Sequence, residues 1–80
     1  MLLNGVIKNK FGDTYHYKSG DLHREDGPAV EYRDGHKQWW RFGKLHREDG
    51  PAVEYIDGKV RYYLHGVEQN RAKAALKETE

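Results

Sequence analysis

One stretch decides the fold of this chain: LHREDGPAVEY at residues 22–32, which returns without a change at residues 45–55. Aligning residues 22–43 with residues 45–66 gives 14 identities in 22 positions, so the repeating unit is 23 residues long. A repeat of this length indicates a supersecondary unit that buries its apolar surface only against neighbouring copies. The sequence therefore predicts a stack of similar units.

A more divergent copy precedes the two faithful ones. Moving the alignment back by 23 residues places Gly12 against Gly35 and Gly20 against Gly43, although this copy lacks the proline and has no HRED segment before it. We expect one domain over residues 1–80 with four parts: a degenerate first repeat at 4–26, a second repeat at 27–49, a partial third at 50–66, and a C-terminal helix at 67–80.

Each repeat reads as a β-hairpin. Pro28 cannot donate a ladder hydrogen bond and suits the start of a strand, which then covers residues 29–33. Asp34-Gly35 is typical of a two-residue type I′ turn, because both central positions of that turn need positive φ. Residues 36–42 return as the second strand, and a Gly-Lys turn follows.

The two-residue turn fixes which side chains should face each other. It pairs Arg33 with His36 and therefore Val30 with Trp39. Two columns keep their character in every unit and are the expected core: an aromatic ladder of Tyr17, Trp40 and Tyr63, and a β-branched column of Ile7, Val30 and Val53. We expect a mainly β fold of three stacked 23-residue hairpin repeats, which form a six-stranded antiparallel meander.

The pattern changes from Val67 onward. Residues 68–77 are rich in helix formers and contain no Gly or Pro. Ala72, Ala75 and Leu76 lie at helical spacing and form a narrow apolar stripe. We expect a short α-helix here, which either covers the last strand edge or makes a dimer or partner contact.

Composition limits the class of protein. The chain has 80 residues and a formal net charge of +1, without the basic excess of a general nucleic-acid binder. Its ten aromatic residues supply apolar area that the few aliphatic side chains lack. The absence of cysteine excludes disulfides and cysteine zinc sites. No apolar run reaches the roughly 20 residues of a membrane span, so we expect a cytoplasmic protein.

The motif resembles the MORN repeat family, and most closely its divergent bacterial and phage branch. Two segments carry the resemblance: His46-Arg47-Glu48-Asp49-Gly50-Pro51-Ala52 and Trp39-Trp40. The usual family signature is richer in glycine than this chain. The resemblance implies a meander of stacked hairpins used for protein contacts, and no catalytic residue. Some members are linked to membrane lipids, and some bacterial relatives behave as antitoxin components.

The repeated HRED segment offers the first candidate site. His23 and His46 lie one repeat apart and could share a ligand or metal, but zinc needs three or four convergent ligands. Alternatively, Arg24 and Arg47 pair with nearby carboxylates and hold the connection between units. We favour this second interpretation and expect no metal site and no cofactor.

Trp39 offers the second candidate site, because adjacent strand residues point to opposite faces and Trp40 belongs to the expected core. Trp39 would then lie in an exposed aromatic row with basic neighbours, unless the helix or the connections cover it. Trp, Tyr and Arg dominate interface hot spots. The candidate binding residues are Trp39, Arg41, Lys37, Tyr62, Arg61, His46 and Arg47.

The sequence holds no catalytic constellation. Ser19 is its only serine, and the glycines mark turns rather than a phosphate-binding loop. We therefore expect a non-enzymatic protein-interaction module, an inhibitor or antitoxin-like protein of a bacterium or phage that binds a host protein. Two alternatives stay open: sequestration of a nucleotide or other anionic small molecule, and binding to nucleic acid or an anionic membrane. A homodimer is also open.

Overall fold

The computed structural model describes residues 4–69, and its regular structure in this range is entirely β-strand. The expectation of a mainly β, antiparallel fold is confirmed. The described strands are β1 (Gly5–Lys8), β2 (Thr14–Lys18), β3 (Asp21–Leu22), β4 (Val30–Glu31), β5 (Lys37–Gln38), β6 (Trp40–Arg41), β7 (Lys44–Leu45), β8 (Val53–Glu54), β9 (Val60–Leu64) and β10 (Val67–Gln69).

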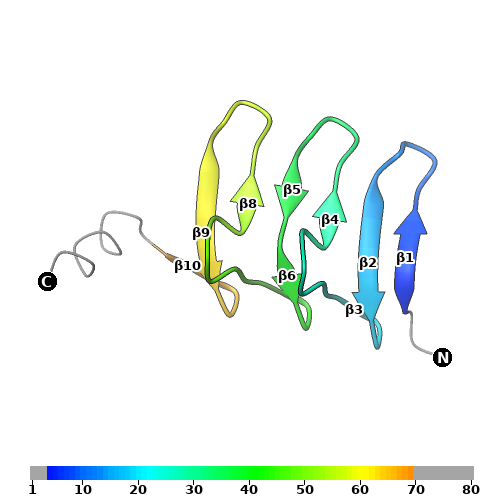
Figure 1. The fold of residues 1–80 in the computed structure, drawn as a ribbon, viewed down its shortest axis with the longest axis horizontal. Coiled ribbons are helices and arrows are strands. Elements are labelled where there is room, and N and C mark those ends of the chain that lie inside the picture. Colours follow the sequence, from blue (N-terminus) through cyan, green and yellow to red (C-terminus); the bar gives the residue numbers. More distant parts are fainter. Residues whose placement is uncertain (1–3, 70–80) are drawn as a thin grey trace, which may run out of the picture.

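Most strands share one sheet. Its order is β1-β2-β4-β5-β8-β9-β10, with β3 paired to β2, whereas β6 and β7 form a separate two-stranded ladder. The hairpins lie side by side in chain order, from β1 at one end to β9 and β10 at the other (Figure 1). Two crossover segments, residues 23–29 and 46–52, connect successive hairpins.

The described strands are shorter and more numerous than the six that the sequence predicts. The strands β3, β7 and β10 were not expected, and the middle return strand is divided because it changes its neighbour at Trp39. The Trp39 amide donates to the carbonyl of Ala52 at 2.7 Å, whereas its carbonyl accepts from the amide of His46 at 3.0 Å. One residue therefore joins two different segments, and the ladder is interrupted between β5 and β6. His16 makes the corresponding bonds one repeat earlier, to Ala29 and His23.

The tight turns lie at the opposite end of each hairpin from the expected place. Phe42 and Gly43 both have positive φ, 50° and 77°, as a type I′ turn requires. The Asp34-Gly35 turn, in contrast, is a three-residue loop: the amide of Gly35 donates to the carbonyl of Tyr32 at 3.0 Å, and Tyr32 pairs with His36. The expected two-residue turn at Asp34-Gly35 is therefore wrong.

This longer loop shifts the register by one residue. Val30 pairs with Gln38, not with Trp39. The physical reason is the Asp34 carboxylate, which accepts the amide of His36 at 3.0 Å and stabilises a loop with one more residue. A shift by one residue changes which side chains share a face.

The core is small. It consists of Ala29, Val30, Ala52 and Val53, which are at most 4% exposed. The expectation for Val30 and Val53 is confirmed, but Ile7 is 38% exposed because β1 has a neighbouring strand on one side only among the described residues. The expected aromatic ladder of Tyr17, Trp40 and Tyr63 is half-buried rather than part of the core.

The expected C-terminal helix does not begin at Val67. Val67–Gln69 form β10, which pairs with β9 in the register Val67 to Leu64. The rest of the expected helix, residues 70–80, lies outside the described residues.

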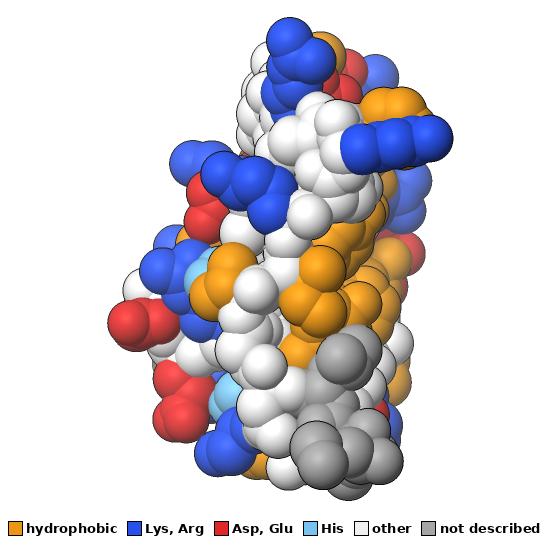
Figure 2. Space-filling model, turned by 90° about the vertical axis from the view of Figure 1, so that its right-hand side faces the viewer, with side chains coloured by type: hydrophobic (Ala, Val, Ile, Leu, Met, Phe, Trp, Pro, Cys, Tyr) orange, Lys and Arg blue, Asp and Glu red, His pale blue; other side chains and the backbone are white. Residues whose placement is uncertain are grey.

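The register sorts side chains onto two faces, because residues paired across a ladder point the same way. The crossover face is defined by Glu31, Lys37 and Glu54, which pair in one row. The tyrosine face is defined by the opposite set: Tyr15, Val30, Gln38, Val53 and Arg61 pair in one row, and Tyr32 and Tyr55 follow Val30 and Val53 by two positions. Viewed from the β1 end, hydrophobic side chains gather on one side of the molecule, and histidine and several acidic side chains gather on the other (Figure 2).

Candidate functional site

The two histidines of the HRED segments link successive hairpins. His46 is 6% exposed, and its Nδ1 accepts the backbone amide of His65 at 2.9 Å. His23 is 7% exposed and accepts the amide of Phe42 at 3.0 Å in the same way. Because Nδ1 accepts in both cases, the ring proton is assigned to Nε2. These histidines bind the left-handed turn of the next unit, and their burial leaves little of either ring accessible to a ligand.

The two arginines hold the crossovers in shape. Arg47 donates to the carboxylates of Asp49 and Glu54 at 3.1 and 3.2 Å and to the carbonyl of Pro51 at 3.1 Å. A Cβ atom built on Gly50 would lie 2.9 Å from its guanidinium carbon, so the glycine lets the guanidinium lie against the backbone. Arg24 repeats this arrangement with Asp26, Pro28, Glu31 and Gly27.

Each arginine also covers a ring of the crossover face. The guanidinium carbon of Arg47 lies 4.0 Å from the centroid of a Trp39 ring, a stacked cation–π contact. Arg24 lies 3.1 Å from Nε2 of His16, the residue that aligns with Trp39. The crossovers therefore cover Trp39, which was one of the two alternatives for this residue.

The seven sequence-predicted binding residues do not form one surface. His46 is buried, and Arg47 covers Trp39, as described above. Lys37 is exposed on the crossover face, and Arg41 is half-buried opposite Lys44 in the β6–β7 ladder. Arg61 lies on the other face, opposite Val53, and pairs with Glu68 at 2.9 Å. Tyr62 is half-buried opposite Gln69.

The structure brings together a different set of rings on the tyrosine face. Tyr15 meets Tyr32 at 6.4 Å between centroids, Tyr32 meets His36 at 6.3 Å, and His36 meets Tyr55 at 5.4 Å. All three contacts are edge-to-face, with interplanar angles of 82–89°. We call these four residues the aromatic strip. It crosses three hairpins: Tyr32, His36 and Tyr55 lie in one row across the strands, and Tyr15 is offset by two residues along β2.

Sequence reasoning missed the aromatic strip because of the register error. With Val30 opposite Trp39, Tyr32 would share a face with Trp39 and Lys37, whereas the observed register places it with Gln38 and Val53. One signal was present in the sequence: Tyr32 and Tyr55 occupy the same position of two repeats.

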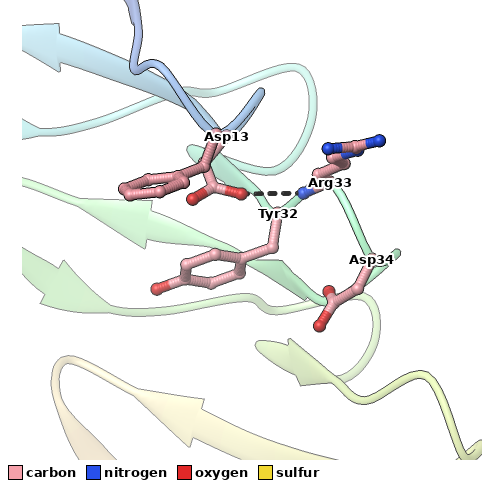
Figure 3. A pocket seen from close by; sticks show the side chains of 5 residues that line it. Asp13, Tyr32, Arg33 and Asp34 are labelled. Carbon is pink, nitrogen blue, oxygen red and sulfur yellow. Dashed lines mark hydrogen bonds between the residues drawn. The ribbon is translucent and has the colours of Figure 1, made fainter.

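A pocket of about 460 Å³ lies at one end of the aromatic strip, between the first two turns. Its lining residues are Phe11, Asp13, Tyr32, Arg33 and Asp34. The carboxylates of Asp13 and Asp34 both lie near the Tyr32 side chain, and the guanidinium of Arg33 extends away from both (Figure 3). The pocket depends on the divergent first repeat, because Phe11 and Asp13 stand where the second repeat has Asp34 and His36.

Local hydrogen bonds set the charge of this pocket. The amide of His36 and then its ring lower the pKa of the Asp34 carboxyl below its ordinary value, so Asp34 is ionised at neutral pH. The Asp13 carboxylate accepts the amide of Arg33 at 2.9 Å and the side-chain amide of Asn9 at 3.1 Å. Burial, and then the neighbouring Tyr32, raises the pKa of Tyr15 above its ordinary value, which keeps its hydroxyl protonated.

The part of the chain that the structure describes shows no cluster of three or more metal-ligating side chains. Over the same residues, no helix has the length and apolar character needed to span a bilayer. Comparison with known proteins finds no matching family model, no matching curated protein and no matching solved structure.

Proposed function

We propose that this chain is a non-enzymatic protein-interaction module that binds its partner through the tyrosine face. The observation that carries the proposal is the aromatic strip, a row of rings in mutual contact on the face opposite the arginines of the crossovers. Tyr is among the residues enriched in binding hot spots, and a rigid sheet presents such rings at low entropic cost.

The scaffold that we propose is a MORN-like stack of hairpin repeats with a 23-residue period, at residues 4–26, 27–49 and, as a partial third repeat, 50–66. Its support is the recurrence of contacts at this spacing. Glycines with positive φ occur at positions 12, 35 and 58 and again at 20, 43 and 66. The bonds of Arg24 and His23 recur at Arg47 and His46.

We further propose that the biological role is that of an inhibitor or antitoxin-like protein of a bacterium or phage, which binds a host protein in the cytoplasm. This step rests on the resemblance of the HRED and Trp-Trp segments to that branch of the family. A surface of rings without a catalytic constellation suits a protein that acts by occupying a partner.

Partner capture tests the proposal. The immobilised chain is exposed to bacterial lysate, and captured proteins are compared between the wild type, Tyr55→Ala and a control, Lys37→Ala, on the crossover face. We expect Tyr55→Ala to lose a partner that Lys37→Ala retains. The proposal fails if both variants capture the same proteins as the wild type, or if the folded wild type captures none.

The alternative functions have less support in the geometry. The pocket beside Tyr32 carries the carboxylates of Asp13 and Asp34, which repel a phosphate. Arg24 and Arg47, the arginines best placed beside aromatic or imidazole rings, already bind carboxylates of their own chain. A nucleotide at 100 times its dissociation constant would stabilise the fold by about 2.7 kcal/mol, so a thermal-shift screen would detect this ligand class.

A further inference from the structure

The spacing of the aromatic strip matches one kind of peptide. Equivalent residues of successive hairpins lie two strands apart, and strands are spaced by 4.7–4.9 Å, so the period of the surface is about 9.6 Å. Three residues of a polyproline II helix, one full turn, advance by about 9.3 Å. One turn of an α-helix advances by about 5.4 Å, and alternate residues of a β-strand by about 6.7 Å. Of these three advances, that of the polyproline II turn is nearest to the spacing of the hairpins.

The rings are arranged to receive such a segment. Tyr32 and Tyr55 are one repeat apart, and both stand perpendicular to the His36 ring between them, at 89°. Both tyrosines are half-buried, so each ring is held in place while part of it stays accessible. Proline-rich segments dock onto aromatic side chains, and their conformation is already fixed before binding.

The pocket gives the segment a direction. Tyr32 belongs both to the aromatic strip and to the pocket wall, and beside it lie the carboxylates of Asp13 and Asp34. The Arg33 guanidinium extends away from these carboxylates, and its Cδ would lie 3.4 Å from a Cβ atom built on Gly12. The pocket wall thus combines two carboxylates with the rings of Phe11 and Tyr32, a set of groups that complements a cationic side chain.

We propose that the tyrosine face binds a proline-rich segment in the polyproline II conformation, with prolines three residues apart over Tyr32 and Tyr55. A Lys or Arg about one turn further along that segment enters the pocket between Asp13 and Asp34. The segment runs across the strands, parallel to the stack of hairpins. This inference rests on the proposed function, because it names the chemistry of the partner for the same face.

The competing occupants fit less well. An added β-strand would pair with a sheet edge, whereas the aromatic strip lies on a face. An anionic ligand would meet the carboxylates of Asp13 and Asp34. A general hydrophobic partner would need no cation at the pocket. The contribution of the cation to binding is therefore tested separately.

Fluorescence anisotropy with short labelled peptides tests the proposal on the full chain. The probe is KPPPPPP, and its matched controls are EPPPPPP, which reverses the charge, and KGSGSGS, which keeps the charge without the polyproline II conformation. We expect binding in the order KPPPPPP, EPPPPPP, KGSGSGS. Raising the salt concentration should narrow the gap between the first two, because exposed charges are screened.

Variants of the chain locate the site. Tyr55→Ala should weaken KPPPPPP at least about fivefold, the effect of one hot-spot residue, whereas Tyr55→Phe keeps the ring and should bind nearly as the wild type does. Asp34→Asn should weaken KPPPPPP without weakening EPPPPPP. Lys37→Ala, on the crossover face, should leave both affinities unchanged. Circular dichroism of each variant confirms that it is folded.

Each other outcome overturns a stated part. Equal affinity for KPPPPPP and KGSGSGS overturns the polyproline II recognition, and equal affinity for KPPPPPP and EPPPPPP overturns the cation pocket. No binding of any peptide by the folded chain overturns the inference as a whole. If Tyr55→Ala nevertheless loses a captured partner, the proposed function stands and only its partner chemistry is wrong.

Discussion

The two crossovers, residues 23–29 and 46–52, have identical sequences but different neighbours. Arg47 stacks on an indole at 4.0 Å, whereas Arg24 lies against an imidazole nitrogen at 3.1 Å. His46 packs against His65, and His23 packs against Phe42, at centroid distances of 4.5 and 4.4 Å. The two arginines therefore make the same bonds inside both crossovers, while the neighbouring hairpins differ. We expect these neighbours to decide how each crossover responds to mutation and pH.

The largest expected effect comes from the arginines. Arg47→Ala removes two carboxylate contacts, a bond to the Pro51 carbonyl and the stacking on Trp39, so we expect a loss of about 2–3 kcal/mol in the free energy of unfolding. Arg24→Ala should cost less, by about 0.5 kcal/mol, because a hydrogen bond to His16 replaces the indole stacking. Urea denaturation measures both. Equal losses would show that the hydrogen bond to His16 and the stacking on Trp39 contribute equally, and would contradict the expected difference.

The histidines come next. His46→Leu keeps most of the side-chain volume but removes the acceptor for the His65 amide, and we expect a loss of about 2 kcal/mol. His23→Leu should lose less, because Nε2 of His46 bonds Glu48 at 3.3 Å, whereas Nε2 of His23 lies 3.6 Å from Glu25 and makes no hydrogen bond within residues 4–69. Asn carries an oxygen near the position of Nδ1, so His46→Asn is the matched control and should recover part of the loss. A His46→Asn variant as unstable as His46→Leu would refute the acceptor role.

The mainly β fold, the arginine pairs of the crossovers and the buried valines could be predicted from the sequence. Arg24 and Arg47 pair with carboxylates as expected, and Val30 and Val53 are buried as expected. These features depend on residue type and spacing alone, which a repeat displays directly.

The faces could not be predicted, because Asp34-Gly35 is compatible with both a two-residue and a three-residue loop. The difference of one residue moved Tyr32 to the face opposite Trp39 and hid the aromatic strip. The cover over Trp39 could not be predicted either. Arg47 follows Trp39 by eight residues and contacts it from a crossover. The alternation of side chains along a strand does not predict such a contact.

The glycines beneath the arginines should have a smaller effect. A Cβ on Gly50 would lie 2.9 Å from the guanidinium carbon of Arg47, and on Gly27 it would lie 3.0 Å from that of Arg24. We expect Gly50→Ala to cost about 1–2 kcal/mol through the displaced guanidinium. The double variant Gly50→Ala with Arg47→Ala is the control, since the alanine then has room. Additive losses in the double variant would contradict the proposed contact.

The smallest expected effect is a difference in pH response between the crossovers. Burial, and then the charge of Arg24, lowers the pKa of His16 below its ordinary 6.5. When the pKa of a histidine is lower in the folded than in the unfolded state, the stability of the fold is unaffected by that histidine above the unfolded pKa. Below pH 6.5 the unfolded chain binds the proton more readily, so the free energy of unfolding should fall. Trp39, at the aligned position, does not titrate. The pKa of the Asp26 and Asp34 carboxyls is also lowered, and these groups affect the free energy of unfolding in a separate pH range, below 3.8.

Replacing His16, the residue beside Arg24, tests this dependence of stability on pH. His16→Trp gives the first crossover the ring of the second, so we expect the decline in unfolding free energy between pH 7 and pH 5 to become shallower. His36→Ala is the matched control, because it removes a histidine from the other face and leaves the His16–Arg24 contact intact. A His16→Trp variant with the same pH profile as the wild type would locate the acid sensitivity elsewhere. The difference between His16 and Trp39 would then not explain how the two crossovers differ in their response to pH.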